Sequence, residues 1–590
     1  MKKLFIYALL LAAAIPGRAQ YYLRGEIKDE KGQGISGVKI YLHSAKAFYY
    51  SGATYGSFGI TTQKLYDTLT VSLEGYETKT IPVKSDIWQK IVLKVSAADA
   101  SKNKPKLISV TKDMKQSSKF NWFAGDETYF QLVENEFVNT AGYPNTGFSL
   151  NVNKASYSNV RRFINQESPV PPDAVRIEEL INYFNLHYRE PKNNDVFRME
   201  SALTSCPWNK DEQLLFLNVN AKKLDLNKVP PGNFVFLIDV SGSMDMPNRL
   251  PLLKAAFQLF VKNLRPVDKV SIVTYGGNVE EWLEPTSGAL KDTILKSIEE
   301  LEAAGDTPGE SAIRMAYRVA ERSFIKEGNN RIILATDGDF NVGENSEKAL
   351  DELITKQKQS GVYLTCLGVG MGNFKDSKLQ TLAKKGNGNY AYLDDIGEAE
   401  KVLVKELTQT FFSVADDVFM NVQFNASMVK QYRLIGFDNK KEALTDFSND
   451  LEGGEIGSGN STLAIFEILP TQQNLLTTNT NVSDDIAKLE LRYSLPGDTV
   501  VKKLFYDVKD NFQTIDSADK ELKFAAVVSM FAMKLKQSKF LGNVDWDFIK
   551  QAAMNSADRN NYLQNGFLQL IEKAEKIYDD KKKKKKKKET

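Results

Sequence analysis

Histidine and cysteine are scarce in this chain. Among its 590 residues there are 2 histidines, His43 and His187, and 2 cysteines, Cys206 and Cys366. A Ser-His-Asp relay needs a histidine beside its nucleophile, and zinc sites built from histidine or cysteine need several such ligands. The shortage disfavours both classes, so any catalysis would run on carboxylates, lysines or oxygen-bound metals. The two cysteines form either a disulfide or two separate buried thiols, and the apolar strand pattern around Cys366 favours the thiols.

Long apolar runs are absent beyond the N-terminus. The first twenty residues, MKKLFIYALLLAAAIPGRAQ, combine two lysines, a short apolar core and an end of small residues. This pattern is typical of a secretory signal peptide. We therefore expect residues 1–19 to be removed and the protein to be exported to the periplasm or the cell surface. A membrane-spanning helix needs about 18 consecutive apolar residues, and no later segment supplies them, so we do not expect an integral membrane protein.

Positive charge is concentrated at the C-terminus. The formal net charge is only +2, yet eight consecutive lysines occupy Lys581–Lys588. A block of like charges repels itself and is solvated, so residues 581–590 are predicted to be a disordered tail that makes at most weak contacts with an anionic surface. The rest of the chain has no basic stripe with interleaved aromatic residues, so we expect no specific nucleic-acid binding.

The first folded region is predicted to be a β-sandwich over residues 20–98. The stretches RGEIKDEKGQGISGVKIYLHS and TLTVSLEGYETKTIPV alternate apolar and polar residues and contain glycine turns. The pattern GEIKDEKGQGISGVKI, followed by VSLEGY, resembles the carboxypeptidase regulatory-like domains of exported bacterial proteins. That resemblance implies a spacer or an accessory binding unit. The polar, aperiodic residues 99–125 that follow are predicted to be a linker.

An α/β pattern occupies residues 231–415. The apolar strand segments FVFLIDV, KVSIVTY, RIILATD, VYLTCLGVG and NYAYLDD alternate with helical segments such as LPLLKAAFQLFVKNL. This alternation predicts a doubly wound, mostly parallel sheet, in which ligands bind beyond the carboxyl ends of the strands. The chain is thus expected to be multidomain. The predicted flanking regions are an α+β companion at 126–230, a β-rich region at 416–515 and a helical segment at 516–580.

Oxygen-bearing side chains are predicted to gather at one edge of this sheet. Asp239, Ser241 and Ser243 follow the first strand at alternate positions, so in an extended chain they face one side. Thr307 lies in a glycine-bearing loop before a helix, and Asp337 ends another apolar strand. Such a set of oxygens, three of them neutral hydroxyls, suits a hard cation such as Mg²⁺. Serine and aspartate also cap helices and close turns, which is the alternative for Asp239, Ser241 and Ser243.

The pattern Asp239-x-Ser241-x-Ser243 with Thr307 and Asp337 is similar to the metal-ion-dependent adhesion site of von Willebrand factor type A domains. The resemblance implies a Rossmann-like fold in which Ser241, Ser243 and Thr307 contact the metal, while Asp239 and Asp337 act directly or through water. It implies Mg²⁺, or Mn²⁺ or Ca²⁺, with an open position for a carboxylate of a partner protein. The flanking stretches FSLNVNKASYSNVRRFI and YRLIGFDN resemble a bacterial exported subgroup of this family.

The sequence departs from the family pattern in two places. Asn151 and Asn153 stand where acidic residues are expected upstream, so no metal role is assigned to them. Asp306 and Pro308 flank the threonine where small residues are usual. An extra carboxylate there would strengthen cation binding and make the open position less attractive to an acidic ligand.

Two other motifs raise the alternatives of dinucleotide binding and of hydrolysis, and the residues around them disfavour both. The loop GVGMG hints at dinucleotide binding, but Asn373 stands where the third glycine of the fingerprint would fall, and the loop does not follow the first strand. Asp337 and Asp339 could perform acid–base work, yet no nucleophile stands beside them, so a metal-dependent hydrolase is disfavoured.

The sequence therefore predicts an exported, non-enzymatic protein-binding module for adhesion or assembly, in which the metal bridges to an acidic residue of a partner. The alternative is a structural subunit of a cell-envelope assembly, in which the metal stabilises the fold and contacts no partner.

Overall fold

The computed structural model divides the chain into two compact units, residues 1–106 and 107–590. It describes residues 21–30, 32, 34–35, 37–51, 56–73, 76–94, 127–193, 195–225, 228–305, 309–338, 354, 360–371, 374–438, 454–471, 485–498 and 500–589, the last ten for their backbone alone. The predicted signal peptide, the predicted linker and Thr307 lie outside these residues.

The first unit is a β-sandwich. Its two sheets have the strand orders β4-β1-β7 and β3-β2-β5-β6, and one apolar core lies between them. Alternate residues of each strand face that core; in β4, for example, Phe58 and Ile60 are buried while their neighbours are exposed. The strands are β1 (Tyr21–Lys28), β2 (Lys39–Leu42), β3 (Ala47–Tyr50), β4 (Ser57–Thr62), β5 (Tyr66–Ser72), β6 (Lys79–Lys84) and β7 (Gln89–Val92).

The centre of the second unit is a six-stranded sheet of order β14-β13-β12-β15-β16-β17. All neighbours are parallel except β14 and β13, so the predicted doubly wound fold is confirmed, with an antiparallel edge strand that the sequence pattern did not reveal. The strands are β12 (Gly232–Asp239), β13 (Lys269–Gly276), β14 (Asn278–Ser287), β15 (Asn329–Thr336), β16 (Val362–Gly368) and β17 (Tyr390–Tyr392).

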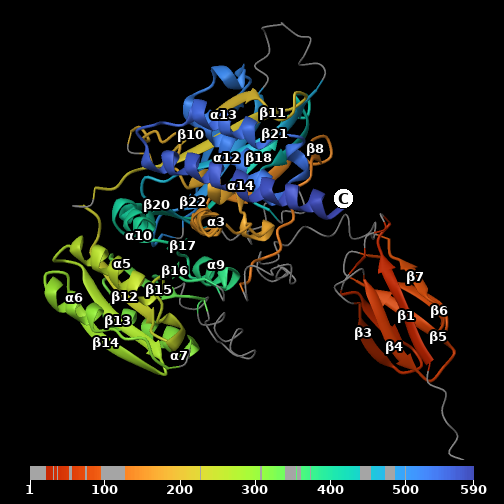
Figure 1. Cartoon of the computed structure of the whole chain (residues 1–590), viewed down its shortest axis with the longest axis horizontal. Coiled ribbons are helices and arrows are strands. Elements are labelled where there is room, and N and C mark those ends of the chain that lie inside the picture. Colours follow the sequence, from red (N-terminus) through yellow and green to blue (C-terminus); the bar gives the residue numbers. More distant parts are fainter. Residues whose placement is uncertain are drawn as a thin grey trace, which may run out of the picture. The chain divides into compact units, whose positions relative to one another are not determined.

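Helices cover both faces of this sheet (Figure 1). One apolar core joins α5, α6 and the helical turns after β17, and the other joins α7 and α9. The apolar spacing of α5 explains its packing, since Leu253, Ala256, Phe257 and Phe260 share one buried stripe. The helices are α5 (Leu250–Lys262), α6 (Lys291–Glu299), α7 (Gly309–Arg322), α9 (Asp376–Lys385), α10 (Ile396–Glu400), a π-helical turn at Lys401–Lys405 and α11 (Leu407–Phe411).

The three predicted flanking regions are not separate, because strands from both sides of the central domain share two sheets. The first sheet has the order β24-β10-β11-β21-β19-β8, and the second has β20-β18-β22-β23 with β9 beside β18. The division at 126–230, 416–515 and 516–580 is therefore wrong. These strands are β8 (Val138–Asn139), β9 (Asn145–Ser149), β10 (Phe197–Ser205), β11 (Gln213–Ala221), β18 (Ser413–Phe424), β19 (Val429–Leu434), β20 (Gly454–Gly457), β21 (Ser461–Pro470), β22 (Asp485–Ser494), β23 (Lys502–Lys509) and β24 (Phe512–Gln513).

This flanking domain has three layers, two sheets and a layer of helices (Figure 1). In β11, Leu215 and Leu217 face the second sheet, whereas Leu214 and Phe216 face the helices. Since strand residues alternate between faces, a continuous apolar run such as Leu214–Leu217 in β11 must be covered on both sides. The helices are α3 (Ala155–Asn165), α4 (Ile177–Asn182), α12 (Lys520–Lys536), α13 (Trp546–Ser556) and α14 (Tyr562–Glu589).

The lysine run is helical rather than disordered, because α14 continues through it to Glu589. Extending an existing helix avoids the cost of nucleation, and lysine has a good intrinsic helix propensity. Among the described residues, no helix combines the length and apolar character needed to cross a bilayer.

The two cysteines are free thiols in different cores. Cys206 lies in the core beneath the flanking helices, and Cys366 lies in β16 of the central sheet. Burial raises the pKa of both thiols above its usual range, so both stay protonated and unreactive at neutral pH. The alternative of separate buried thiols is confirmed.

Buried ion pairs join the central domain to the flanking domain. Arg331 of β15 donates two hydrogen bonds of 3.0 Å to the carboxylate of Glu455 in β20, and both side chains are about 1% exposed. Arg176 binds Asp376 in the same way at 2.6 and 3.2 Å. Because an unpaired buried charge is strongly unfavourable, these pairs hold the two domains in one arrangement.

Glu455→Ala is expected to lower the free energy of unfolding by about 3–5 kcal/mol, since it leaves the guanidinium of Arg331 buried without a counter-charge. Urea unfolding followed by far-UV circular dichroism measures the loss. The control is Glu300→Ala, which removes an exposed i,i+4 pair with Lys296 and should cost less than about 1 kcal/mol. Equal effects of the two variants would contradict the argument.

Candidate metal site at the edge of the central sheet

Asp239 is the last residue of β12 and is fully buried. One carboxylate oxygen accepts a hydrogen bond from the backbone N–H of Ser241 at 2.9 Å, and the other accepts one from the hydroxyl of Thr336 at 2.7 Å. Burial raises the pKa of Asp239 to about 6, although these hydrogen bonds favour the charged form. Both oxygens are therefore already engaged by the chain, which suits an indirect role towards a bound ion.

The two serine hydroxyls converge with the carboxylate of Asp337. The Oγ atoms of Ser241 and Ser243 lie 3.2 Å apart, and the Oγ of Ser243 donates to Oδ2 of Asp337 at 2.9 Å. The chain does not stay extended, because a 3₁₀ turn at Gly242–Met244 begins after Ser241. The strand alternation that predicted this grouping thus ends at Ser241, and the turn brings Ser243 to the site.

The loop before Thr307 reaches this edge of the sheet. Ala304 donates its N–H to the carbonyl of Val240 at 2.6 Å, and Gly242 donates to the carbonyl of Gly305 at 3.0 Å. Gly305 has φ +79°, and a Cβ there would lie 2.6 Å from the backbone nitrogen of Gly277, so glycine is required. Four of the five predicted ligands are therefore described and adjacent. Thr307, the fifth, lies outside the described residues.

Arg249, which the sequence analysis did not identify, is the positive group of the site. Its guanidinium donates to Oδ2 of Asp337 at 2.7 Å and to the carbonyl of Ser243 at 2.6 Å. A further hydrogen bond of 2.9 Å reaches the carbonyl of Met371 in the GVGMG loop. No local pattern marks this residue, since two of these three partners, Asp337 and Met371, lie 88 and 122 positions away.

The donor set fits a hard divalent cation. Two carboxylates and two hydroxyls supply only oxygen, the donor type that Mg²⁺, Mn²⁺ and Ca²⁺ prefer. The hydroxyls of Ser241 and Ser243 and the carboxylate of Asp337 form one hydrogen-bonded group into which such an ion would bind. An ion there would share Asp337 with the guanidinium of Arg249.

This fold and this edge of the sheet define a von Willebrand factor type A domain, and comparison with known families agrees. The family described as von Willebrand factor type A domain matches residues 233–406, one described as von Willebrand factor matches 124–216, and one described as the C-terminal part of an uncharacterized protein YfbK matches 409–577. The uncharacterized protein YfbK of Escherichia coli (strain K12) is 36% identical over 476 residues, which cover 77% of this chain and 82% of that protein. The chain belongs to the same family as that protein.

Other similarities are more distant. Inter-alpha-trypsin inhibitor heavy chain H2 of Mesocricetus auratus is 28% identical over 203 residues, which are 33% of this chain and only 21% of that protein. Among solved structures, a von Willebrand factor type A protein from Catenulispora acidiphila aligns with a TM-score of 0.38 and 13% identity, covering 62% of this chain and 88% of that one. The ArnB paralog VWA2 from Sulfolobus acidocaldarius aligns with a TM-score of 0.32 and 14% identity, covering 65% and 98%.

Arg249→Gln is expected to strengthen Mg²⁺ binding by roughly tenfold, or about 1.4 kcal/mol. The substitution removes a positive charge that binds the same carboxylate as the ion, and like charges repel strongly at short range. Isothermal titration calorimetry of the metal-stripped full chain measures the change.

The matched control is Arg249→Lys, which keeps the charge and should leave the affinity close to that of the unchanged protein. Weaker binding in Arg249→Gln would mean that the arginine supports the site through the carbonyl of Ser243 rather than competing with the ion.

Proposed function

We propose that this protein is an exported, non-enzymatic binding module for adhesion or assembly. A Mg²⁺ ion, or Mn²⁺ or Ca²⁺, would be held by Asp239, Ser241, Ser243, Thr307 and Asp337 and would bind a carboxylate of a partner protein. The observation that supports this most directly is the convergence of Ser241, Ser243 and Asp337 in one hydrogen-bonded group at the carboxyl edge of the sheet.

The donor chemistry explains why an external anion would bind. In this proposal the neutral hydroxyls contact the ion, while Asp239 acts through water because the chain already engages both of its oxygens. Hydroxyls neutralise less of the ion's charge than carboxylates do, so the ion keeps its affinity for a further negative ligand. Asp337 and that partner carboxylate would then share the charge.

The surroundings of the site suit a protein ligand. Met246 and Met371 lie on two loops beside the site, and both side chains are exposed. The carbonyl of Met246 accepts from the backbone N–H of Arg249, and the carbonyl of Met371 accepts from its guanidinium. Methionine side chains adapt their shape and are common on protein-binding surfaces. Exposed apolar side chains beside the charged centre would give a protein ligand surface to bind that a small anion could not use.

The second candidate is a structural subunit of a cell-envelope assembly with a purely structural metal. The complete burial of Asp239 and the ion pair of Arg249 with Asp337 favour it, since both tie the site into the fold. In that case the ion would contribute folding free energy and would contact no partner.

Asp239→Ala is expected to abolish Mg²⁺ binding, because it removes the carboxylate that orients the serine turn. Calorimetric titration of metal-stripped full-length protein should show one site in the unchanged chain and none in the variant. The control is Asp245→Ala. Asp245 is exposed and lies two positions beyond Ser243, so this variant should bind Mg²⁺ as the unchanged protein does. Absence of Mg²⁺, Mn²⁺ and Ca²⁺ binding in all three proteins would exclude the metal site.

Chelation separates the two candidate functions. If the metal bridges to a partner, EDTA should release proteins that the immobilised full-length chain captures from an envelope extract, with no change in far-UV circular dichroism. Re-addition of Mg²⁺ should restore capture in the unchanged chain and not in Asp239→Ala. A loss of folded structure in EDTA would instead favour the structural metal.

A further inference from the structure

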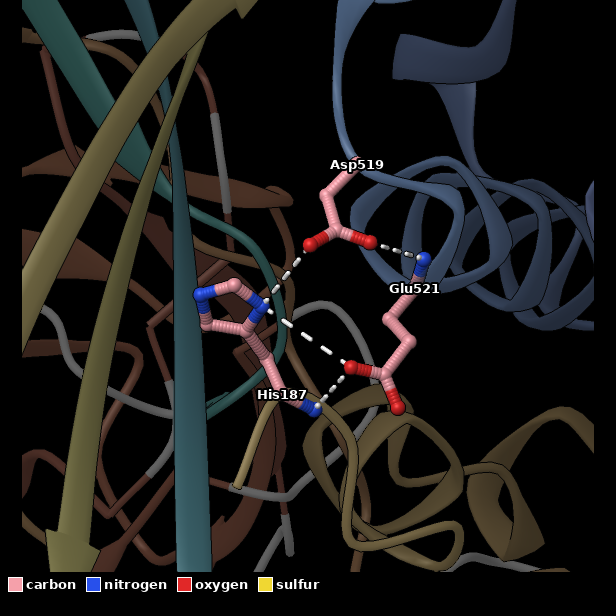
Figure 2. A group of neighbouring side chains, drawn as sticks. All are labelled: His187, Asp519 and Glu521. Atoms are coloured by element: carbon pink, nitrogen blue, oxygen red, sulfur yellow. Dashed lines mark hydrogen bonds and ion pairs between the residues drawn. The ribbon is translucent and has the colours of Figure 1, made fainter. Parts of the chain in front are cut away.

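The flanking domain contains a second group of side chains with metal-binding chemistry. His187 follows α4, and its ring faces the first turn of α12, where Asp519 and Glu521 lie (Figure 2). Its Nδ1 atom is 3.6 Å from Oδ2 of Asp519 and 3.9 Å from Oε2 of Glu521. Nδ1 is buried, and among the described residues it has no hydrogen-bond partner.

These separations are too long for hydrogen bonds, whose heavy atoms lie about 2.7–3.2 Å apart. They are close to the distance between two ligands of one ion. Ligands about 2.1 Å from a tetrahedral metal lie about 3.4 Å from each other. A small adjustment of two partly exposed carboxylates would therefore place all three donor atoms around one cation.

A third carboxylate, that of Glu200, lies on the other side of the imidazole ring. Oε2 of Glu200 is 3.8 Å from Nε2 of His187, is buried and has no hydrogen-bond partner among the described residues. A carboxylate on the far nitrogen of a histidine ligand keeps the proton there and leaves the near nitrogen free to bind a metal. The 3.8 Å separation is longer than a hydrogen bond, so Glu200 would orient His187 only after a small shift of its side chain towards the ring.

The backbone of His187 is held in place for this arrangement. Asn218 donates to its carbonyl at 2.7 Å, and its own N–H donates to Oε2 of Glu521 at 3.1 Å. Helix capping accounts for only part of the group. Asp519 caps α12 by accepting from the N–H of Glu521, but this uses Oδ1 and leaves Oδ2 turned to His187.

We propose that His187, Asp519 and Glu521 form a second metal site, which binds a divalent transition-metal ion such as Zn²⁺. One imidazole nitrogen with two carboxylates suits Zn²⁺ better than Mg²⁺ or Ca²⁺, which prefer oxygen alone. Asp519 and Glu521 are 40% and 39% exposed, so water can complete the coordination. The ion would clamp two segments 334 positions apart, on either side of the inserted central domain.

Arg189 is the group that opposes metal binding. Its guanidinium lies 3.5 Å from Oδ2 of Asp519, and the side chain is 44% exposed. The ion would have to displace this partner. Removing the charge by Arg189→Gln should therefore strengthen metal binding, an effect that capping of α12 alone would not produce.

The test is titration of Zn²⁺ into metal-stripped full-length protein in excess Mg²⁺, which occupies the site proposed at Asp239. One Zn²⁺ site is expected, and His187→Asn should abolish it. Asparagine is chosen because His187 has φ +56°, a conformation that asparagine tolerates. The control is His43→Asn in the β-sandwich unit, which should bind Zn²⁺ normally.

Far-UV circular dichroism shows whether His187→Asn folds. If it does not, two further variants still test the proposal. Glu200→Gln should weaken Zn²⁺ binding by about 10–100-fold, and Arg189→Gln should tighten it. Co²⁺ in place of Zn²⁺ should give the intense visible absorption of a four-coordinate ion. Absence of Zn²⁺ binding in the unchanged protein, or unaltered binding across these variants, would overturn the proposal whether or not Mg²⁺ binds near Asp239.

Discussion

The antiparallel pairing of β11 with β21 is the interaction on which the rest of the large unit depends. It aligns Gln213 with Ile468 and Asn220 with Ser461, so it joins segments that the whole central domain separates in sequence. Bringing such distant segments together costs chain entropy, although this cost grows only slowly with the length of the intervening loop. Burial of apolar surface on both faces of the joined sheet offsets it, because β11 and β21 contribute side chains to two cores.

This pairing makes the central domain an insertion tied at both ends. β12 begins at Gly232, eleven residues after β11, and β18 begins at Ser413, two residues after the last helix of the central domain. The buried pairs Arg331–Glu455 and Arg176–Asp376 add contacts away from those two connections. The central domain therefore meets its flanks through ion pairs in which either charge would be costly to leave buried without the other, which favours one fixed arrangement over free movement.

A contiguous set of contacts leads from the candidate metal site to the flanking domain. Asp337 binds Arg249, Arg249 binds the carbonyl of Met371, and the amide of Gln166, which follows α3, lies 2.7 Å from the sulfur of Met371. Occupation of the site by a cation would change the partner of Asp337 at one end of this series. The flanking domain is thus in direct contact with the loop that positions the arginine.

Local sequence determined the central sheet and most of its candidate site. Strand alternation and helical spacing are properties of neighbouring residues, so they predicted the parallel strands and placed Asp239 and Asp337 at strand ends, where parallel strands meet at one edge. The edge strand β14 was missed because its alternation was weaker than the helix signal after it. The union of the flanking regions was missed because strand pairing between distant segments has no local period.

Only the tertiary structure decided which distant groups meet. Arg249 has partners 88 and 122 positions away, and His187 faces two carboxylates more than 330 positions along the chain. One isolated histidine forms no sequence pattern, and in the sequence alone an acid at the start of a helix indicates only a cap. Periodicity records which side of its own strand or helix a residue faces. Periodicity does not predict which residues lie opposite that side, because the packing of the whole unit decides this.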